Sequence, residues 1–89
     1  MLNKYLVEFL GTMFLVYVIF ATGNWLAIGF GLAIPVLVGG PISGGSFNPA
    51  VTLALYASGK LAESDVLPYI IVEILGALAA FYAYKKFVK

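Results

Sequence analysis

Two carboxylates that stand inside apolar segments are the first candidates for chemistry in this 89-residue chain. Glu8 and Glu73 belong to a set of only four acidic residues, and the chain contains no histidine and no cysteine. The absence of these two residue types excludes imidazole acid–base catalysis, disulfides and thiolate metal sites. Any metal site would have to take its oxygen ligands from the four carboxylates. We therefore expect no enzyme, no metal and no cofactor.

The elements that carry these carboxylates are apolar and long. Hydrophobic residues make up 63% of the chain, and a soluble domain this small has too little interior to hide that much apolar surface. Residues 5–22 and 66–84 each contain one charge, and each is long enough to cross a hydrocarbon core of about 30 Å. A shorter apolar stretch, which flanking glycines extend to residues 25–40, predicts a third span. The sequence thus predicts an all-α, multi-pass integral membrane protein, and it leaves open which membrane holds it.

Two other interpretations of the sequence can be weighed, namely a cleaved signal peptide and a surface that binds nucleic acid. A cleaved signal peptide at the N-terminus would have a shorter apolar run and a small-residue cleavage site, whereas this run is longer and carries Glu8. We therefore expect no cleaved signal. A net charge of +1 offers no basic patch for nucleic acid.

Residues 41–57 form the irregular part of the chain. Glycine and proline are concentrated in residues 39–45, and a ten-residue apolar run follows over 47–56. A run of this length is too short to span and is typical of a re-entrant segment. Asn48 is a good helix N-cap and Pro49 suits the first helical position, so we expect a half-helix from Asn48 to about Ala57. The alternative is an amphipathic helix on the membrane surface, which would have a charged face; residues 47–58 carry no charge.

The sequence of residues 40–52, GPISGGSFNPAVT, resembles the Asn-Pro-Ala loop of the aquaporin and glycerol-facilitator family. Further resemblances lie in residues 7–12, 20–23, 29–33 and 69–77, so the likeness covers nearly all of residues 1–89. Channels of that family are built from two inverted halves, and each half contributes one such loop. The motif occurs once here, and the resemblance therefore implies a single half-repeat.

The resemblance also implies roles for the loop and for the two glutamates. Asn48 would donate a hydrogen bond to a permeating oxygen, and the positive end of its half-helix would repel cations. Pro49 and Ala50 would stack the two loops of a complete channel. Glu8 would accept hydrogen bonds from the loop backbone, a role that we favour over one in transport. Glu73, which stands where the family often has glutamine, would do the same work.

Four positions correspond to the narrow filter of the family. They are Val51, Gly45, Val36 and Ile28, with Phe30 in place of Ile28 if the helix carries a gap. Second repeats of the family commonly place arginine where this chain has Val51. The filter would therefore be wider and apolar, which favours small neutral solutes such as glycerol, urea or ammonia beside water. Ordinary helix packing is the alternative role of these side chains.

These observations predict a passive channel, completed by a second copy of the chain in the opposite orientation. The charges on the two sides of the predicted topology are nearly balanced, with Lys4 and Lys60 on one side and Lys85, Lys86 and Lys89 on the other. Lysine and arginine bias fixes orientation, so a balanced chain can insert both ways. By analogy, four such pores would give eight chains. The alternatives are one orientation with a separately encoded partner, and a non-conducting regulatory half-channel that joins a full-length aquaporin.

Overall fold

The computed structural model describes residues 3–88, and this part of the chain contains four helices and no strand. The helices are α1 (Lys4–Thr22), α2 (Trp25–Ser43), α3 (Pro49–Ala57) and α4 (Glu63–Phe87). Three of them, α1, α2 and α4, are long and apolar enough to cross a membrane, whereas α3 has only nine residues, about 13 Å of helix. The predicted all-α fold, with three spanning helices and one half-helix, is confirmed.

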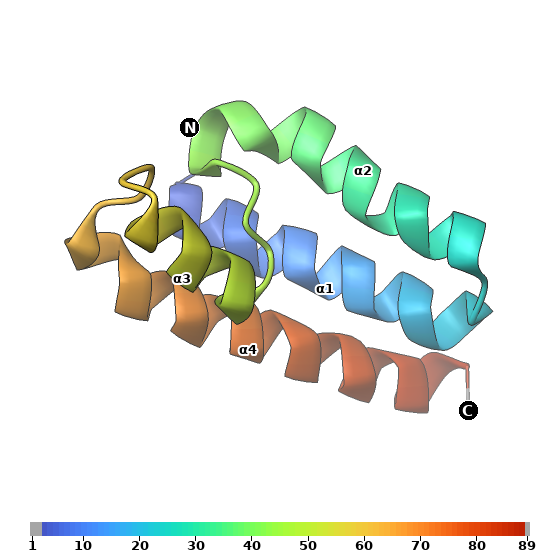
Figure 1. The fold of residues 1–89 in the computed structure, drawn as a ribbon. Coiled ribbons are helices and arrows are strands. Elements are labelled where there is room, and N and C mark those ends of the chain that lie inside the picture. Colours follow the sequence, from blue (N-terminus) through green and yellow to red (C-terminus); the bar gives the residue numbers. More distant parts are fainter. Residues whose placement is uncertain (1–2, 89) are drawn as a thin grey trace.

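The helix α1 lies between α2 and α4, and it packs against both (Figure 1). The N-terminal end of α1 is near the end of α2 and the turn between α3 and α4, whereas the turn between α1 and α2 lies at the opposite end of the molecule, with the C-terminus. From the end of α2 the chain turns back along the bundle, and α3 then returns beside the first half of α4 (Figure 1). The segment formed by the loop and α3 therefore enters the bundle and leaves it at the same end.

Asparagine side chains begin three of the four helices. Asn3, Asn24 and Asn48 each have an extended backbone and accept a hydrogen bond from a backbone N–H in the first turn of α1, α2 and α3, respectively. Such caps satisfy donors that have no partner within the helix. Glycine ends α1 and α2, because Gly23 and Gly44 adopt the left-handed conformation, with φ of 55° and 91°, which glycine adopts without steric cost.

Two helices are longer than the apolar segments that define the spans. The helix α2 continues through Pro41 to Ser43, three residues beyond the expected end at residue 40, and Gly44 ends it. The helix α4 extends past residues 66–84 at both ends. Acidic residues in its first turn and lysines in its last turn complement the helix dipole, so the helix continues where the apolar segment has ended.

Small residues allow the long helices to approach closely. A Cβ atom added at Gly76 of α4 would lie 2.5 Å from the carbonyl oxygen of Phe9 in α1, and one added at Gly39 of α2 would lie 2.6 Å from Val7 Cγ1. Ala80, one turn beyond Gly76, is completely buried. Small residues at helix contacts are typical of membrane bundles, where close packing replaces the hydrophobic effect.

The interior of the described bundle is largely polar, and its exterior is apolar. Seven buried side chains are polar or charged, namely Glu8, Thr12, Ser43, Ser46, Thr52, Asp65 and Glu73, whereas the buried hydrophobic residues are Val7, Phe47, Tyr69 and Ala80. Large apolar side chains are exposed along all four helices, and Trp25 retains 80% of its accessible surface. Lipid solvates such a surface at no cost.

Candidate functional site

The site is built around the N-terminal end of α3, where Asn48 precedes the half-helix. Asn48 Oδ1 accepts a hydrogen bond of 2.7 Å from the Ala50 backbone N–H, and Pro49 needs no partner because it has no N–H. The Asn48 side chain is exposed, and its amide nitrogen donates to no acceptor within residues 3–88. The side chain therefore caps α3 with its oxygen and keeps its donor free for a ligand.

Glu8 of α1 holds the backbone before Asn48 in shape. One carboxylate oxygen accepts from the Phe47 N–H at 2.7 Å. The other accepts from the Ser46 N–H at 3.1 Å and from the Ser43 hydroxyl at 2.7 Å. The glutamate is completely buried. Irregular backbone inside a membrane must be satisfied by protein, and these bonds satisfy the N–H groups of a non-helical loop that is buried within the bundle.

Glu73 of α4 holds the other side of the loop. The Thr52 hydroxyl of α3 lies 2.8 and 3.0 Å from the two carboxyl oxygens of Glu73. The hydroxyl groups of Ser46 and Thr52 are also hydrogen-bonded to each other. Through these contacts Glu73 joins α4 to α3 and, by way of Thr52 and Ser46, to the loop. Glu8 also binds Ser46, so both glutamates hold the same part of the loop.

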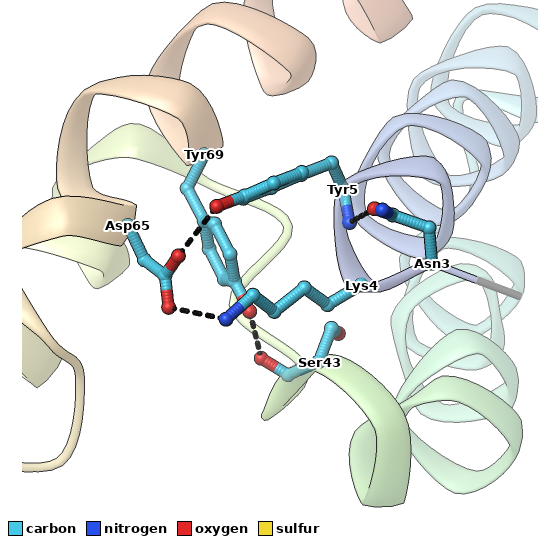
Figure 2. A network of polar contacts seen from close by, with 6 residues as sticks. All are labelled: Asn3, Lys4, Tyr5, Ser43, Asp65 and Tyr69. Carbon is cyan, nitrogen blue, oxygen red and sulfur yellow. Dashed lines mark hydrogen bonds and ion pairs between the residues drawn. The ribbon is translucent and has the colours of Figure 1, made fainter.

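A second polar cluster joins the helix ends on the N-terminal side of the molecule (Figure 2). Asp65 accepts from the Tyr5 hydroxyl at 2.7 Å and forms a 2.8 Å ion pair with Lys4, so it connects the starts of α1 and α4. The Tyr69 hydroxyl donates to the Ser43 carbonyl oxygen at 2.6 Å. The rings of Tyr5 and Tyr69 meet edge to face, with their centroids 5.9 Å apart. This cluster fixes the point from which the loop leaves α2.

Phe47 is a site residue that the sequence reasoning missed. It adopts a left-handed conformation, with φ of 55°, and only 2% of its surface is exposed. A bulky residue at positive φ is unusual and is retained only where the surroundings enforce it. Its ring lies directly against Gly11 of α1, at a position that any Cβ atom would occupy. An aromatic residue immediately before Asn48 and a glycine in the first span were the available signals.

The four predicted filter positions are not all brought together within one chain. Val36 of α2 lies against Gly45, since a Cβ atom on Gly45 would be 3.5 Å from Val36 Cγ2. Val51 is in the first turn of α3 and is 41% exposed. Ile28 is in the first turn of α2, about 12 Å along that helix from Val36, and is therefore remote from Val36.

Two hollows meet at Phe47. One, of about 380 Å³, is lined by Asn48, Pro49 and Glu73 and extends from the N-terminal end of α3 into the space between α1 and α4. The other, of about 240 Å³, lies between α1 and α2 and is lined almost wholly by apolar groups. The first hollow also receives the Thr12 side chain, whose buried hydroxyl has no hydrogen-bond partner within the described residues.

A comparison with known protein families shows to which family this loop and its helices belong. The profile of the family described as "Major intrinsic protein" matches residues 22–89, which include the loop, α3 and α4. The chain belongs to the major intrinsic protein family. This result confirms the resemblance to aquaporins and glycerol facilitators, and membership supports a membrane channel for water or small solutes. With its three apolar helices, this member of the family is an integral multi-pass membrane protein.

Curated relatives agree with that assignment. The chain is 49% identical over 96 residues to "Glycerol uptake facilitator protein-like 6" of Lactiplantibacillus plantarum, covering 98% of this chain and 44% of that protein. It is 43% identical over 96 residues to "Aquaporin Z" of Brucella melitensis, covering 90% of this chain and 42% of the relative. The chain thus spans less than half the length of the relatives that it matches. No solved structure shows significant similarity to it.

Proposed function

We propose that this chain is half of a passive channel for water and small neutral solutes. The observation that carries the proposal is the free amide donor of exposed Asn48 at the start of α3. A helix N-terminus carries a partial positive charge, which repels cations and orients a water or hydroxyl oxygen toward the donor. The bonds of Glu8 to the Ser46 and Phe47 N–H groups support the loop that presents this donor. Pro49 and Ala50 would form the contact between two such loops.

The proposed pore is completed by a second copy inserted in the opposite orientation. The chain spans less than half the length of its relatives, and inverted repeats related by an axis in the membrane plane are common among transporters. Lys60 is exposed at one end of the bundle, where Lys4 is paired with Asp65, and Lys85 and Lys86 are exposed at the other end. Such a balance supports insertion in both directions. Lys89, which was also counted in the sequence, lies outside the described residues.

The antiparallel arrangement gives Ile28 a place in the filter. Val36 is seven residues from the C-terminal end of α2, and Ile28 is three residues from its N-terminal end. Since an antiparallel copy exchanges these ends, Ile28 of the second copy would lie within roughly 6 Å of the depth of Val36. Val51, Gly45, Val36 and Ile28 of the second copy would then form an apolar constriction without a fixed charge. Such a constriction would pass glycerol, urea or ammonia beside water.

Swelling of liposomes that contain only this chain tests the proposal. We expect water permeability above that of protein-free liposomes, and its loss in Asn48→Asp, because aspartate still caps α3 but lacks the amide donor and adds negative charge. Asn24→Asp is the matched control, since Asn24 caps α2 in the same way at the end of the bundle. It should leave permeability unchanged.

The outcome also separates the channel from its rival. Well-folded protein that gives no permeability alone, but changes the permeability of a co-reconstituted full-length aquaporin, would establish the regulatory half-channel instead. A series of solutes in the same assay would rank water, glycerol and urea. The particle mass in detergent would test the four-pore, eight-chain assembly.

A further inference from the structure

The Thr12 hydroxyl is a buried polar group without a partner in the part of the chain that the structure describes. Only 3% of the Thr12 surface is exposed, and its hydroxyl oxygen forms no hydrogen bond there. The other two threonines of the sequence are satisfied. Thr22 donates at 2.8 Å to the carbonyl oxygen of Val18, four residues earlier, as helical threonines often do, and Thr52 donates to Glu73. Because an unpartnered buried hydroxyl is costly, a partner for Thr12 should come from outside these residues.

Thr12 lies close to the place where α3 begins. It follows Glu8 by four residues on the same face of α1, and Glu8 binds the backbone immediately before Asn48. On the side of α4, a Cβ atom added at Gly76 would lie 3.3 Å from Thr12 Cβ, and Gly76 is three residues beyond Glu73. Thr12, Asn48 and Glu73 all line the larger hollow, of about 380 Å³. The free hydroxyl is therefore part of the wall of the hollow at which α3 starts.

The polar groups that line this hollow are few and of complementary kinds. Asn48 offers amide N–H groups that donate to no acceptor among the described residues, and the start of α3 adds a partial positive charge. Glu73 contributes carboxyl oxygens, and the Thr12 hydroxyl can both accept and donate. The other lining residues are all apolar. A small number of polar groups in apolar walls is typical of a site for a small molecule.

These groups also determine which ligands the hollow can take. A cation would meet the positive end of α3 and the Asn48 N–H groups, and an anion would meet the carboxyl group of Glu73. A neutral molecule that only accepts hydrogen bonds would satisfy Asn48 but would leave the Thr12 oxygen without a donor. A molecule that both accepts and donates can serve the two residues together.

We propose that Thr12 is a specificity-determining residue, whose hydroxyl binds the same small neutral molecule that Asn48 binds. An oxygen of the molecule accepts from the Asn48 amide, and one of its O–H or N–H groups donates to the Thr12 oxygen. Water, glycerol and urea all carry such a pair of groups. The choice of these ligands rests on the proposed function, but binding at Thr12 does not require that the molecule crosses the membrane.

Titration of glycerol into the purified protein, with isotope-labelled threonine methyl groups, tests the binding by NMR. The sequence has only three threonines, so each methyl resonance can be assigned by replacing one residue. We expect a saturable shift of the Thr12 resonance, which Asn48→Asp abolishes because the amide donor is lost. Thr22 is the internal control, because it is exposed beside the turn between α1 and α2, at the opposite end of the bundle from the start of α1 (Figure 1).

Two results of this titration would overturn the proposal. One is a Thr12 resonance that stays unchanged, or that shifts only in proportion with Thr22, up to molar glycerol. The other is a saturable shift that survives in Asn48→Asp, since the two residues would then not bind one molecule. Neither result depends on whether the protein conducts.

Swelling of liposomes measures the consequence for transport. Thr12→Val keeps the shape of the side chain and removes a hydroxyl without a partner in the described residues, so the variant should fold. We expect its water and glycerol fluxes to fall about three- to tenfold, because the molecule crosses the hollow with one hydrogen bond fewer. Thr12→Ser, which retains the hydroxyl, should restore most of the flux. Unchanged flux in Thr12→Val, beside a conducting wild type, would contradict the proposal.

The two measurements together distinguish this proposal from the proposed channel. A wild-type protein that binds glycerol at Thr12 but gives no permeability would refute the channel and support the site. A second copy of the chain that covers Thr12 would give a different result, namely no glycerol-dependent shift in the wild type and a lower particle mass for Thr12→Val in detergent. That result would overturn the proposal and assign the hydroxyl to the contact between copies.

Discussion

Asn48 and Asn24 illustrate how the same side chain acquires different roles from its position. Both accept a backbone hydrogen bond at the start of a helix, but Asn24 does so in a turn at the end of the bundle, whereas Asn48 does so beside a hollow that also includes Glu73. The capping role is satisfied by the oxygen alone. Asn48 differs from Asn24 because its free amide N–H groups lie beside that hollow.

Gly11 should tolerate no side chain, because the ring of Phe47 occupies the position of a Cβ atom. We expect Gly11→Ala to lower the free energy of unfolding by about 1–3 kcal/mol, the usual cost of overpacking, and to displace the loop. Gly40→Ala is the control, since its Cβ atom would meet only Val36 Cγ1 at 3.9 Å. Denaturant titration in detergent compares the two, and equal stabilities would show that the ring can move aside.

Val51 is a predicted filter position whose side chain is exposed, so a charge can be added there. If it lines the constriction, Val51→Arg should reduce glycerol or urea flux more than water flux, because the long cation narrows the passage. Val51→Leu, which adds volume without charge, should have a smaller effect on both. Solute and water swelling rates measure this, and equal loss of both fluxes in folded Val51→Arg would place Val51 outside the constriction.

Sequence reasoning located residues whose chemical type is unusual for their surroundings. Glu8, Asn48 and Glu73 are polar groups in apolar segments, and such groups need a reason to be there. Phe47 and Thr12 are not of an unusual type in this sense, because an aromatic residue and a threonine are ordinary in a membrane helix or loop, and for Phe47 the available signals were only its place before Asn48 and a glycine in the first span. Their importance depends on contacts with Gly11 and on burial between helices, which residue type alone does not determine.

At the scale of helices, α2 and α4 are separated by α1, and Tyr69 provides a hydrogen bond across that separation. Its hydroxyl reaches the last carbonyl of α2, at Ser43, while 99% of the Tyr69 surface is buried. This bond fixes the end of α2 relative to the start of α4. The loop and α3 connect these two points. The loop therefore depends on a contact that lies outside it.

Tyr69→Phe should lower the free energy of unfolding by about 1–3 kcal/mol, because the Ser43 carbonyl would be left buried without its partner. The matched change Tyr82→Phe removes a hydroxyl from a side chain that is 63% exposed on the same helix, and it should change stability by less than about 0.5 kcal/mol. Denaturant titration in detergent compares them. Equal effects would indicate that water replaces the lost bond at Ser43.

The sequence predicted the number of helices more directly than it predicted where each helix ends. Three apolar segments and one short run predicted four helices, since hydropathy is set by the need to match the hydrocarbon core. The end of α2 was placed at residue 40 because the apolar run and the glycines that flank it end there, yet the helix runs to Ser43. Two hydrogen bonds stabilise that last turn, one from the Ser43 hydroxyl to Glu8 and one from the Tyr69 hydroxyl to the Ser43 carbonyl oxygen. Both partners come from distant parts of the chain.

At the scale of the whole molecule, the absence of cysteine makes orientation directly measurable. We expect single-cysteine variants Lys60→Cys and Lys86→Cys, at opposite ends of the bundle, each to be labelled from both sides of intact membranes. Both positions are exposed, and neither replaces a lysine that is ion-paired. Labelling of Lys60→Cys from one side only, with Lys86→Cys labelled only from the other, would exclude the dual-orientation dimer and indicate a separate partner half.

The polar interior of the bundle has a consequence for how this sequence tolerates change. In a soluble protein the positions least free to vary are apolar, because core packing is what most substitutions disturb. Here seven of the buried side chains are polar or charged, while large apolar residues face outward. Substitution among leucine, isoleucine, valine and phenylalanine on the outer faces, apart from the proposed filter positions, should therefore be close to neutral. Replacement of a buried serine, threonine or glutamate by an apolar residue of equal size should be rejected. Hydrophobicity, the usual guide to which positions matter, points in the opposite direction in this protein.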